Sequence, residues 1–190
     1  MGLAKSVVNV AAGAGATVHT GAGGLYGLWL RENTAVAAAG TVQVYDNTSA
    51  AGTIIATVRL AANGNSPQLK WKQGVRFNTG LHVVATGADI NGFALIGSPG
   101  ALRAVPFAGA DLLLHTGATE LVSVLAAETA AAAAEWRLYD ALSITGTSFV
   151  GLSHTADATH QLTFDEGVKI GTGLQYDQVA GAVSGNVYIR

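Results

Sequence analysis

The sequence contains no cysteine, and this absence removes several kinds of chemistry. Without thiols the chain forms no disulfide bond, offers no thiolate nucleophile and supplies no sulfur ligand to zinc. Charge is also scarce: only 12% of the residues are charged, about half the usual share, and the net charge is −2. No basic field is present to hold a phosphate backbone or an anionic membrane, so we expect neither nucleic acid nor a membrane as a partner.

Long hydrophobic runs are missing as well. No window of about 20 residues is apolar enough to span a bilayer. The Val/Ala stretch near the N-terminus is interrupted by Asn9 and Gly13, unlike the continuous apolar core of a secretory signal. Hydrophobic residues nevertheless make up 49% of the 190 residues, which argues against intrinsic disorder. We expect a soluble, folded protein that is not exported through a cleaved signal.

An internal repeat organises the chain. Three blocks recur in the same order, and the offset between the copies drifts only from 96 to 93 residues. The matching pairs of blocks are 12–30 with 108–126, 42–46 with 136–140, and 74–96 with 167–189. We interpret the repeat as a tandem duplication of a module of about 85 to 90 residues, which is long enough to carry its own small core.

The repeat divides the chain into four parts. We expect an N-terminal arm over residues 1–9, a first module over 10–98 and a second module over 107–190. The segment between the modules, 99–106, contains two of the three prolines and is predicted to be a linker. The arm is a candidate for reaching over a neighbouring subunit, because a terminal strand adds readily to a sheet edge.

Each module has the pattern of antiparallel β-structure. Apolar and charged residues alternate over 69–72, and residues 53–60 are rich in β-branched side chains. The segments 78–80 and 171–173 are typical of tight hairpin connections. We therefore predict an all-β protein made of two tandem small antiparallel sandwich or barrel modules, with six to eight strands each.

One segment has the opposite tendency. Residues 128–135, ETAAAAAE, have a high helix propensity by composition. Their counterpart in the first module, 32–40, contains Asn and Gly, and the repeat favours one conformation for both. We expect a strand, a bulge or a short turn at 128–135 rather than a long helix.

The five histidines do not form an obvious metal site; they are His19, His82, His115, His154 and His160. His19 and His115 are equivalent in the repeat, and neither has a second ligand at a suitable spacing, so turn chemistry is the favoured interpretation. His154 and His160 flank Asp157 in a polar stretch, for which we favour a solvated loop, with a weak metal site as the alternative. We predict no bound metal and no cofactor.

No catalytic residue is predicted either. Ser98 lies in Gly-Ser-Pro-Gly, which lacks the spacing and the following helix of a nucleophile elbow. Among the acidic residues, only Asp46/Asp140 and Glu32/Glu128 match across the repeat. Asp46 and Asp140 each follow a tyrosine at a strand end, where a turn-capping role is expected. We therefore expect no enzyme activity.

The three tryptophans are the candidates for a sugar-stacking platform. Trp136 aligns with Val42 and is expected in a core, and Trp71 lies in an alternating strand whose apolar side should face the core. Trp29 completes the set. Carbohydrate binding through these rings is retained as an alternative function.

The strand-and-turn motifs carry a resemblance. The run 40–50, followed by 52–53, 74–81 and 83–87, resembles small β-rich virion proteins of tailed bacteriophages, including capsid decoration (cement) proteins. The likeness covers most of the first module, while the second retains Tyr139-Asp140 and the motif of 167–174. These are structural motifs and not site residues, so the resemblance transfers no catalytic or binding residue.

The resemblance implies a virion protein that binds the outer surface of the capsid and stabilises the shell. Its partner would be the major capsid protein, and its own oligomeric state a homotrimer, as is common among decoration proteins. It would be made in the host cytoplasm and end in the virion. A tail, connector or fibre-base component is the nearest alternative, and a carbohydrate-binding sandwich module is an alternative of another class.

Overall fold

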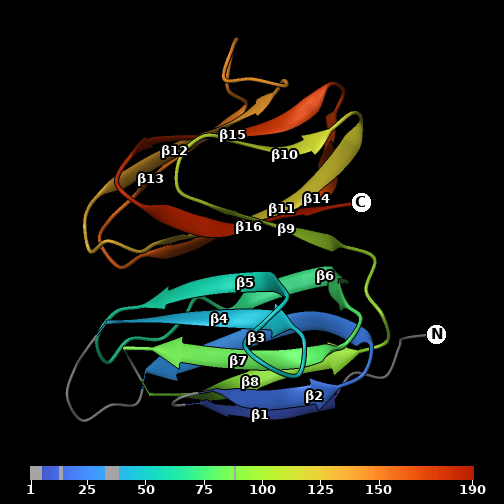
Figure 1. The fold of residues 1–190 in the computed structure, drawn as a ribbon, viewed down its shortest axis with the longest axis vertical. Coiled ribbons are helices and arrows are strands. Elements are labelled where there is room, and N and C mark those ends of the chain that lie inside the picture. Colours follow the sequence, from blue (N-terminus) through green and yellow to red (C-terminus); the bar gives the residue numbers. More distant parts are fainter. Residues whose placement is uncertain (1–5, 13–14, 33–38, 88) are drawn as a thin grey trace.

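The computed structural model describes residues 6–12, 15–32, 39–87 and 89–190. These residues form sixteen strands and no helix, which confirms the prediction of an all-β protein. The part of the chain described therefore holds no helix of the length and hydrophobicity that a membrane crossing requires. Two bodies lie one above the other in Figure 1, and each consists of two sheets.

The first module is a sandwich of two four-stranded sheets, ordered β1-β8-β3-β6 and β2-β7-β4-β5. Every pairing is antiparallel, and the strand order places β5 and β6 at the ends of their sheets. The strands are β1 (Ser6–Ala12), β2 (Ala16–Thr20), β3 (Gly23–Glu32), β4 (Gly40–Asp46), β5 (Thr53–Leu60), β6 (Leu69–Phe77), β7 (Gly80–Thr86) and β8 (Ile90–Gly97).

The second module repeats this arrangement with every strand number raised by eight. Its sheets are ordered β9-β16-β11-β14 and β10-β15-β12-β13. The strands are β9 (Arg103–Ala108), β10 (Leu112–Thr116), β11 (Thr119–Glu128), β12 (Ala134–Asp140), β13 (Val150–His154), β14 (Thr159–Ile170), β15 (Gly173–Ala180) and β16 (Val183–Ile189). The same fold thus occurs twice in the described residues, and a tandem duplication stays our interpretation of its origin.

Irregular positions repeat as well. The pairing of β3 shifts register between Leu25 and Gly27, and that of β11 shifts at the equivalent place. Gly74 and its counterpart Gly167 have φ values of +67° and +76°, in the left-handed region where a side chain is disfavoured. Gly92 of β8 lies so close to the Trp29 carbonyl oxygen that a Cβ would fall 2.0 Å from it. Glycine at these positions is therefore a requirement of the backbone.

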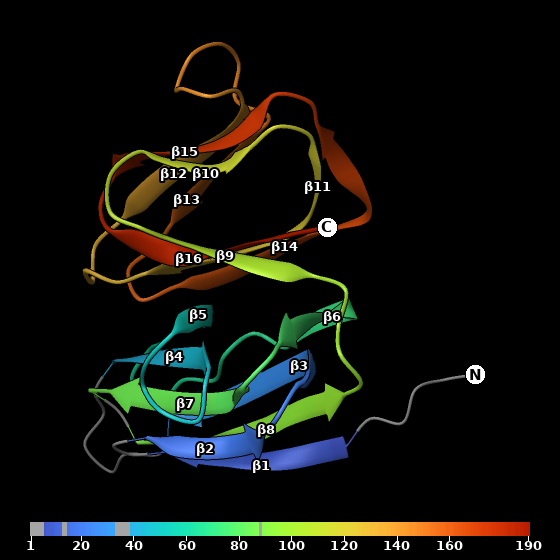
Figure 2. The same ribbon diagram turned by 45° about the vertical axis from the view of Figure 1, so that its right-hand side comes forward.

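The core of the first module extends into the second. Its buried cluster contains side chains from the connecting segment and from the neighbouring sheet of the second module: Leu102, Ala104, Val122, Leu125 and Tyr188. The second module has a separate cluster around Trp136, Tyr176 and Phe107. Figures 1 and 2 show why, because β5 and β6 lie against the sheet β9-β16-β11-β14 in both views. The two modules form one packed body.

Two predicted boundaries differ from the structure. Residues 6–9 of the expected arm belong to β1, which pairs with β8 of its own module because Val8 and Val10 pack on the core; residues 1–5 lie outside the described residues. The predicted linker 99–106 is hydrogen-bonded or paired in a strand from Ala101 onward. Leu102 is hydrogen-bonded to β6, and 103–106 begin β9, an end strand in which Pro106 is tolerated.

The alanine-rich segment is not helical. Strand β11 ends at Glu128, a bend follows, and β12 begins at Ala134. Ala134 is buried in the core of the second module, so strand pairing overrides the helix propensity of the alanines. The prediction of a strand, a bulge or a short turn in place of a long helix is confirmed here, whereas residues 33–38 of the counterpart lie outside the described residues.

Candidate interaction surfaces

Side chains of the second module cap the open backbone edges of the first. The Thr159 hydroxyl accepts a hydrogen bond from the Arg59 N–H at 2.7 Å and donates to the Arg59 carbonyl at 2.9 Å. The Gln161 amide bonds the N–H of Lys70 at 3.0 Å and its carbonyl at 3.1 Å. Arg59 lies on β5 and Lys70 on β6, so one residue of each end strand has both its backbone N–H and its carbonyl hydrogen-bonded to a side chain of the second module.

Two residues of β16 complete this contact. Asn186 Nδ2 donates to the Ile54 carbonyl at 2.8 Å, and the Tyr188 hydroxyl donates to the Ile55 carbonyl at 3.0 Å. The Tyr188 ring packs edge-on against Trp71 at 5.3 Å between centroids. Burial raises the pKa of Tyr188 well above its ordinary value, so the hydroxyl stays a donor. The interface is closed to water at its centre.

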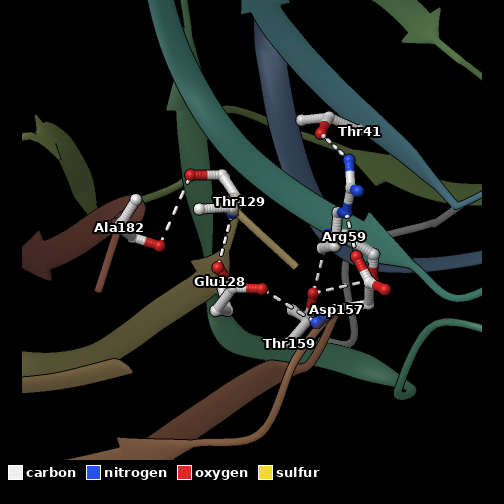
Figure 3. Close-up of polar contacts among 8 residues, drawn as sticks. Thr41, Arg59, Glu128, Thr129, Asp157, Thr159 and Ala182 are labelled. Atoms are coloured by element: carbon white, nitrogen blue, oxygen red, sulfur yellow. Dashed lines mark hydrogen bonds and ion pairs between the residues drawn. The ribbon is translucent and has the colours of Figure 1, made fainter. Parts of the chain in front are cut away.

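One ion pair of the interface is sheltered and another is not. Arg59 Nε lies 2.8 Å from Asp157, and its guanidinium also donates to Thr41 (Figure 3). Lys72 lies 2.9 Å from Asp165, but these side chains are 80% and 75% exposed. A pair so open to solvent contributes little to stability, whereas the Arg59 pair, with side chains 15% and 23% exposed, is less screened by water.

The matched glutamates hold equivalent loops. Glu32 accepts a hydrogen bond from the Asn63 N–H at 2.8 Å, and Glu128 accepts one from the Asp157 N–H at 2.9 Å, a contact drawn in Figure 3. Asn63 and Asp157 have φ values of 55° and 57°, so each carboxylate supports a strained turn residue. Both glutamates are buried, and their role is structural.

The matched aspartates cap hairpins, as predicted. Asp46 accepts hydrogen bonds from two backbone N–H groups of the β6–β7 turn, both at 2.8 Å. Asp140 accepts bonds from Gly171 at 2.9 Å and Thr172 at 2.8 Å in the β14–β15 turn. These bonds lower the pKa of Asp140. Neither carboxylate is free for acid–base chemistry.

His154 does not lie in a solvated loop, so that prediction is wrong. It ends strand β13, it is buried, and its Nε2 accepts a hydrogen bond from Trp136 Nε1 at 2.8 Å. Burial lowers the pKa of His154, and the charge of nearby His160, whose ring lies 4.6 Å away, lowers it further. His154 is buried because it ends a strand beside Trp136, whose indole N–H needs an acceptor.

The other histidines have separate local partners. His82 Nδ1 is bonded to the Thr17 hydroxyl at 3.1 Å, and His115 Nδ1 to Arg103 at 3.2 Å. His19 packs edge-on against Phe77. Within the described residues no three side chains of metal-binding type gather, and the metal alternative for His154 and His160 gains no third ligand.

A groove runs over the outer face of the sheet β1-β8-β3-β6. It has a volume of about 350 Å³, and Trp29 stacks on Phe93 in it at 5.5 Å between ring centroids. Trp136 and Trp71 are buried, as predicted, so they offer no platform to a sugar. Trp29 is half-buried and Phe93 is 44% exposed, which leaves this ring pair as the aromatic surface of the first module.

A cleft of about 490 Å³ lies beside the segment that connects the modules. Arg76 and Arg103 line it together with Asp46. Arg76 is bonded to the Gly100 carbonyl, Arg103 to His115, and Asp46 to the hairpin turn, so the polar groups of the cleft are already engaged. No pair of groups suited to acid–base work converges among these residues.

Several large apolar side chains of the second module are exposed. Leu142 and Ile144 lie in the loop between β12 and β13, and Leu142 is 55% exposed. This loop is seen at the top of Figures 1 and 2, at the end of the molecule farthest from the first module. At the equivalent positions the first module has Thr48 and Ala50. The apolar surface of this loop is thus a property of the second module alone.

The residues that join the modules were missed by the sequence analysis. Gln161 belongs to a Gln-Leu pair that recurs as Gln68-Leu69, which is a usable signal. Thr159 and Tyr188 have no such mark. Their partners lie 100 and 133 residues away in the chain, and local patterns do not report contacts of that range.

Comparison with known proteins adds no family. No protein-family model matches the chain, and no curated protein is significantly similar to it. The candidate functions therefore come from the resemblance of the strand-and-turn motifs and from the surfaces described above.

Proposed function

We propose that this protein is a structural component of a tailed-bacteriophage virion, a decoration protein that binds the outer surface of the capsid and stabilises the shell. The resemblance of the first module to such proteins supports the class. The arrangement of two sandwiches packed as one body supports a structural role. The proposal assigns the protein no catalysis, no metal and no cofactor.

The exposed apolar loop between β12 and β13 is the observation that carries the proposal. Leu142 and Ile144 gain nothing in a free chain, because exposed apolar side chains are unfavourable in water. A partner that covers them recovers this free energy, and such patches mark protein interfaces. We assign the loop as the contact with the major capsid protein.

The contacts between the two modules would allow the protein to stabilise the shell as one rigid bridge. Ala101 and Leu102 are hydrogen-bonded to β6, and Arg59 pairs with Asp157 across the interface, so the two modules are tied together at more than one place. A rigid body that touches two capsid subunits resists their separation, and many such weak bridges act together on a shell. A trimer around a threefold axis would multiply the bridges.

The proposal is tested on empty capsids of the phage whose genome encodes the chain, prepared without this protein. We expect the purified chain to sediment with the capsids and to raise their melting temperature. The double variant Leu142→Asp/Ile144→Asp should lose binding, while the control Val179→Asp, at an exposed apolar position outside the loop, should bind normally. Wild-type protein that stays in the supernatant would contradict the proposal. Binding to isolated tails instead would favour the tail or connector alternative.

Carbohydrate binding is the second candidate, and one observation favours it. Trp29 and Phe93 form an aromatic pair at a surface groove, where sugar rings stack in many proteins. A glycan screen of wild type and Trp29→Ala tests this function. Specific binding that the variant loses would establish it in place of capsid decoration.

A further inference from the structure

The second module has an uncovered edge where the first module is closed. Strands β13 and β14 lie at the ends of their sheets, as β5 and β6 do in the first module. The second module covers β5 and β6, whereas no strand among the described residues lies against the outer edges of β13 and β14; β14 contacts the first module only through side chains on its sheet face, such as Thr159 and Gln161. Phe149, next to β13, is 36% exposed, whereas its counterpart Ile55 is 2% exposed. The second module therefore has the same kind of edge as the first, but without a covering sheet from the described residues.

The difference holds along the whole edge. Apolar residues of the first module that are buried beneath the second have counterparts that are half-buried or exposed. The pairs, first module before second, are Ile55/Phe149, Val58/Leu152, Leu69/Leu162, Trp71/Phe164 and Val75/Val168. The second module thus exposes the flank of its own core, and apolar residues were kept at all five positions. Such an edge is built to be covered.

The first module carries a sheet face equivalent to the one that covers β5 and β6. The second module covers the first with the outer face of the sheet β9-β16-β11-β14, and on the equivalent face of the first module Trp29 and Phe93 are left partly exposed by the described residues. There Trp29 corresponds to Leu125, Phe93 to Asn186 and Leu95 to Tyr188, as the strand registers show. This face carries the groove of about 350 Å³ described above.

Polar groups on this face suit the edge as well. Gln68 corresponds to Gln161, the amide that bonds both backbone groups of Lys70, and it is exposed at the groove. Lys72 corresponds to Asp165. Lys72 and Asp165 already pair with each other within the chain, and in a contact repeated between two chains Lys72 of one would also face Asp165 of the other. The charges are opposite again, so the repeated contact is electrostatically compatible.

We propose that copies of this chain associate head to tail. The outer face of the first module, formed by Trp29, Phe93, Leu95 and Gln68, covers the β13–β14 edge of the second module of the next copy. The contact between molecules then repeats the contact within each molecule. Such an interface is heterologous, so it generates a closed ring or an extended filament, depending on the rotation between copies.

Association is measured by sedimentation velocity of the full chain over a concentration series. The face variant is Trp29→Asp/Phe93→Asp, the edge variant is Phe149→Asp, and Val179→Asp is the control at an exposed apolar site outside both surfaces. We expect wild type and control to form species larger than 19.2 kDa. Each surface variant should weaken association roughly tenfold or more, as loss of a central aromatic contact does.

A second edge variant guards against misfolding. Ser153 corresponds to Arg59, whose N–H and carbonyl face the covering module, so Ser153→Pro removes an outward N–H without touching the pairing with β12. It should weaken association as Phe149→Asp does. A cooperative melting curve of each variant alone would show that the variant is folded.

Mixing the variants distinguishes the geometry. The face variant keeps an intact edge and the edge variant keeps an intact face, so together they should form a dimer that grows no further. Three results would overturn the proposal: a wild type that stays monomeric at all concentrations, surface variants that associate like the control, or a mixture that forms no dimer. A monomer whose face binds a glycan would overturn it too. No capsid is present, so this result and the capsid result are independent.

Discussion

The two modules share a strand order but differ in how their cores are completed. The first module uses side chains of the second, including Leu125 and Tyr188, to close the opening between its sheets. The second closes around its own Trp136 and leaves the flank of Leu162 and Phe164 half-exposed. The comparison teaches that two copies of one fold can differ in packing: the core of the first is completed by side chains of the second, whereas the second leaves the equivalent apolar side chains partly exposed.

The largest expected effect comes from the buried ring at the module interface. Trp71→Ala should lower the free energy of unfolding by about 3–5 kcal/mol, because it opens a cavity beside Tyr188. The matched change Phe164→Ala in the second module should cost roughly half as much, since that ring is only half-buried. Urea unfolding measures both, and equal losses would show that the two edges are not different.

The next effect concerns a feature that only the second module has. His154 and Trp136 replace Leu60 and Val42 of the first module. His154→Leu should cost about 1–3 kcal/mol, because it leaves the buried Trp136 N–H without an acceptor. His154→Gln, which keeps an acceptor, should cost less.

The same histidine gives a pH dependence. Its pKa in the folded protein lies below the ordinary value of 6.5, so the unfolded chain binds the proton more readily. The contribution to stability is complete above pH 6.5 and is lost as the pH falls from 6.5 to the folded pKa. Urea unfolding at pH 7.5 and 5.5 should show a smaller loss for His154→Gln than for wild type. An identical loss would assign the acid sensitivity to other groups.

A smaller effect on stability should distinguish Gln161, whose amide bonds the Lys70 backbone, from its counterpart Gln68. Gln161→Ala removes two hydrogen bonds to the Lys70 backbone and should cost about 1 kcal/mol. Gln68→Ala, on the outer face of the first module, should leave the stability of the single chain within about 0.5 kcal/mol of wild type. Thermal unfolding at low protein concentration tests the pair, and a large loss for Gln68→Ala would mean that it supports its own module.

The smallest effect belongs to the exposed ion pair. Lys72→Ala should change the free energy of unfolding by less than about 0.5 kcal/mol, because Lys72 and Asp165 are largely solvated. The difference from wild type should disappear in high salt. A loss above 1 kcal/mol that persists in salt would place Lys72 in a role that its exposure does not suggest.

The sequence allowed the strands to be predicted because their signals are local. Alternation over 69–72 and the β-branched run 53–60 mark β6 and β5, and the turns at 78–80 and 171–173 occur where expected. The hairpin-capping aspartates followed from their place after a strand. These features depend on neighbours along the chain, and the repeat supplied each with a second example.

The surfaces could not be predicted in the same way. His154 was predicted to be solvated because its neighbours in the chain are polar, yet it ends strand β13 and accepts a hydrogen bond from the Trp136 indole. The expected linker looked free because it contains prolines, yet it is bonded to β6. The alanine-rich segment had helix propensity, and strand pairing overrode it. In each case a contact distant in the chain decided the outcome.

The hydrogen bonds that Thr159 and Gln161 make to the backbone of Arg59 and Lys70 have a consequence for how the chain can evolve. Thr159 and Gln161 hold the main chain of these residues, and a main-chain N–H and carbonyl are present whatever side chain the position carries. Substitutions along the outer side of β5 and β6 therefore leave these bonds intact, except for proline. A change at Thr159 or Gln161 removes them. As far as these backbone bonds are concerned, sequence drift should consequently be restrained at Thr159 and Gln161 and not at Lys70, whereas Arg59 is also held by its side-chain pair with Asp157.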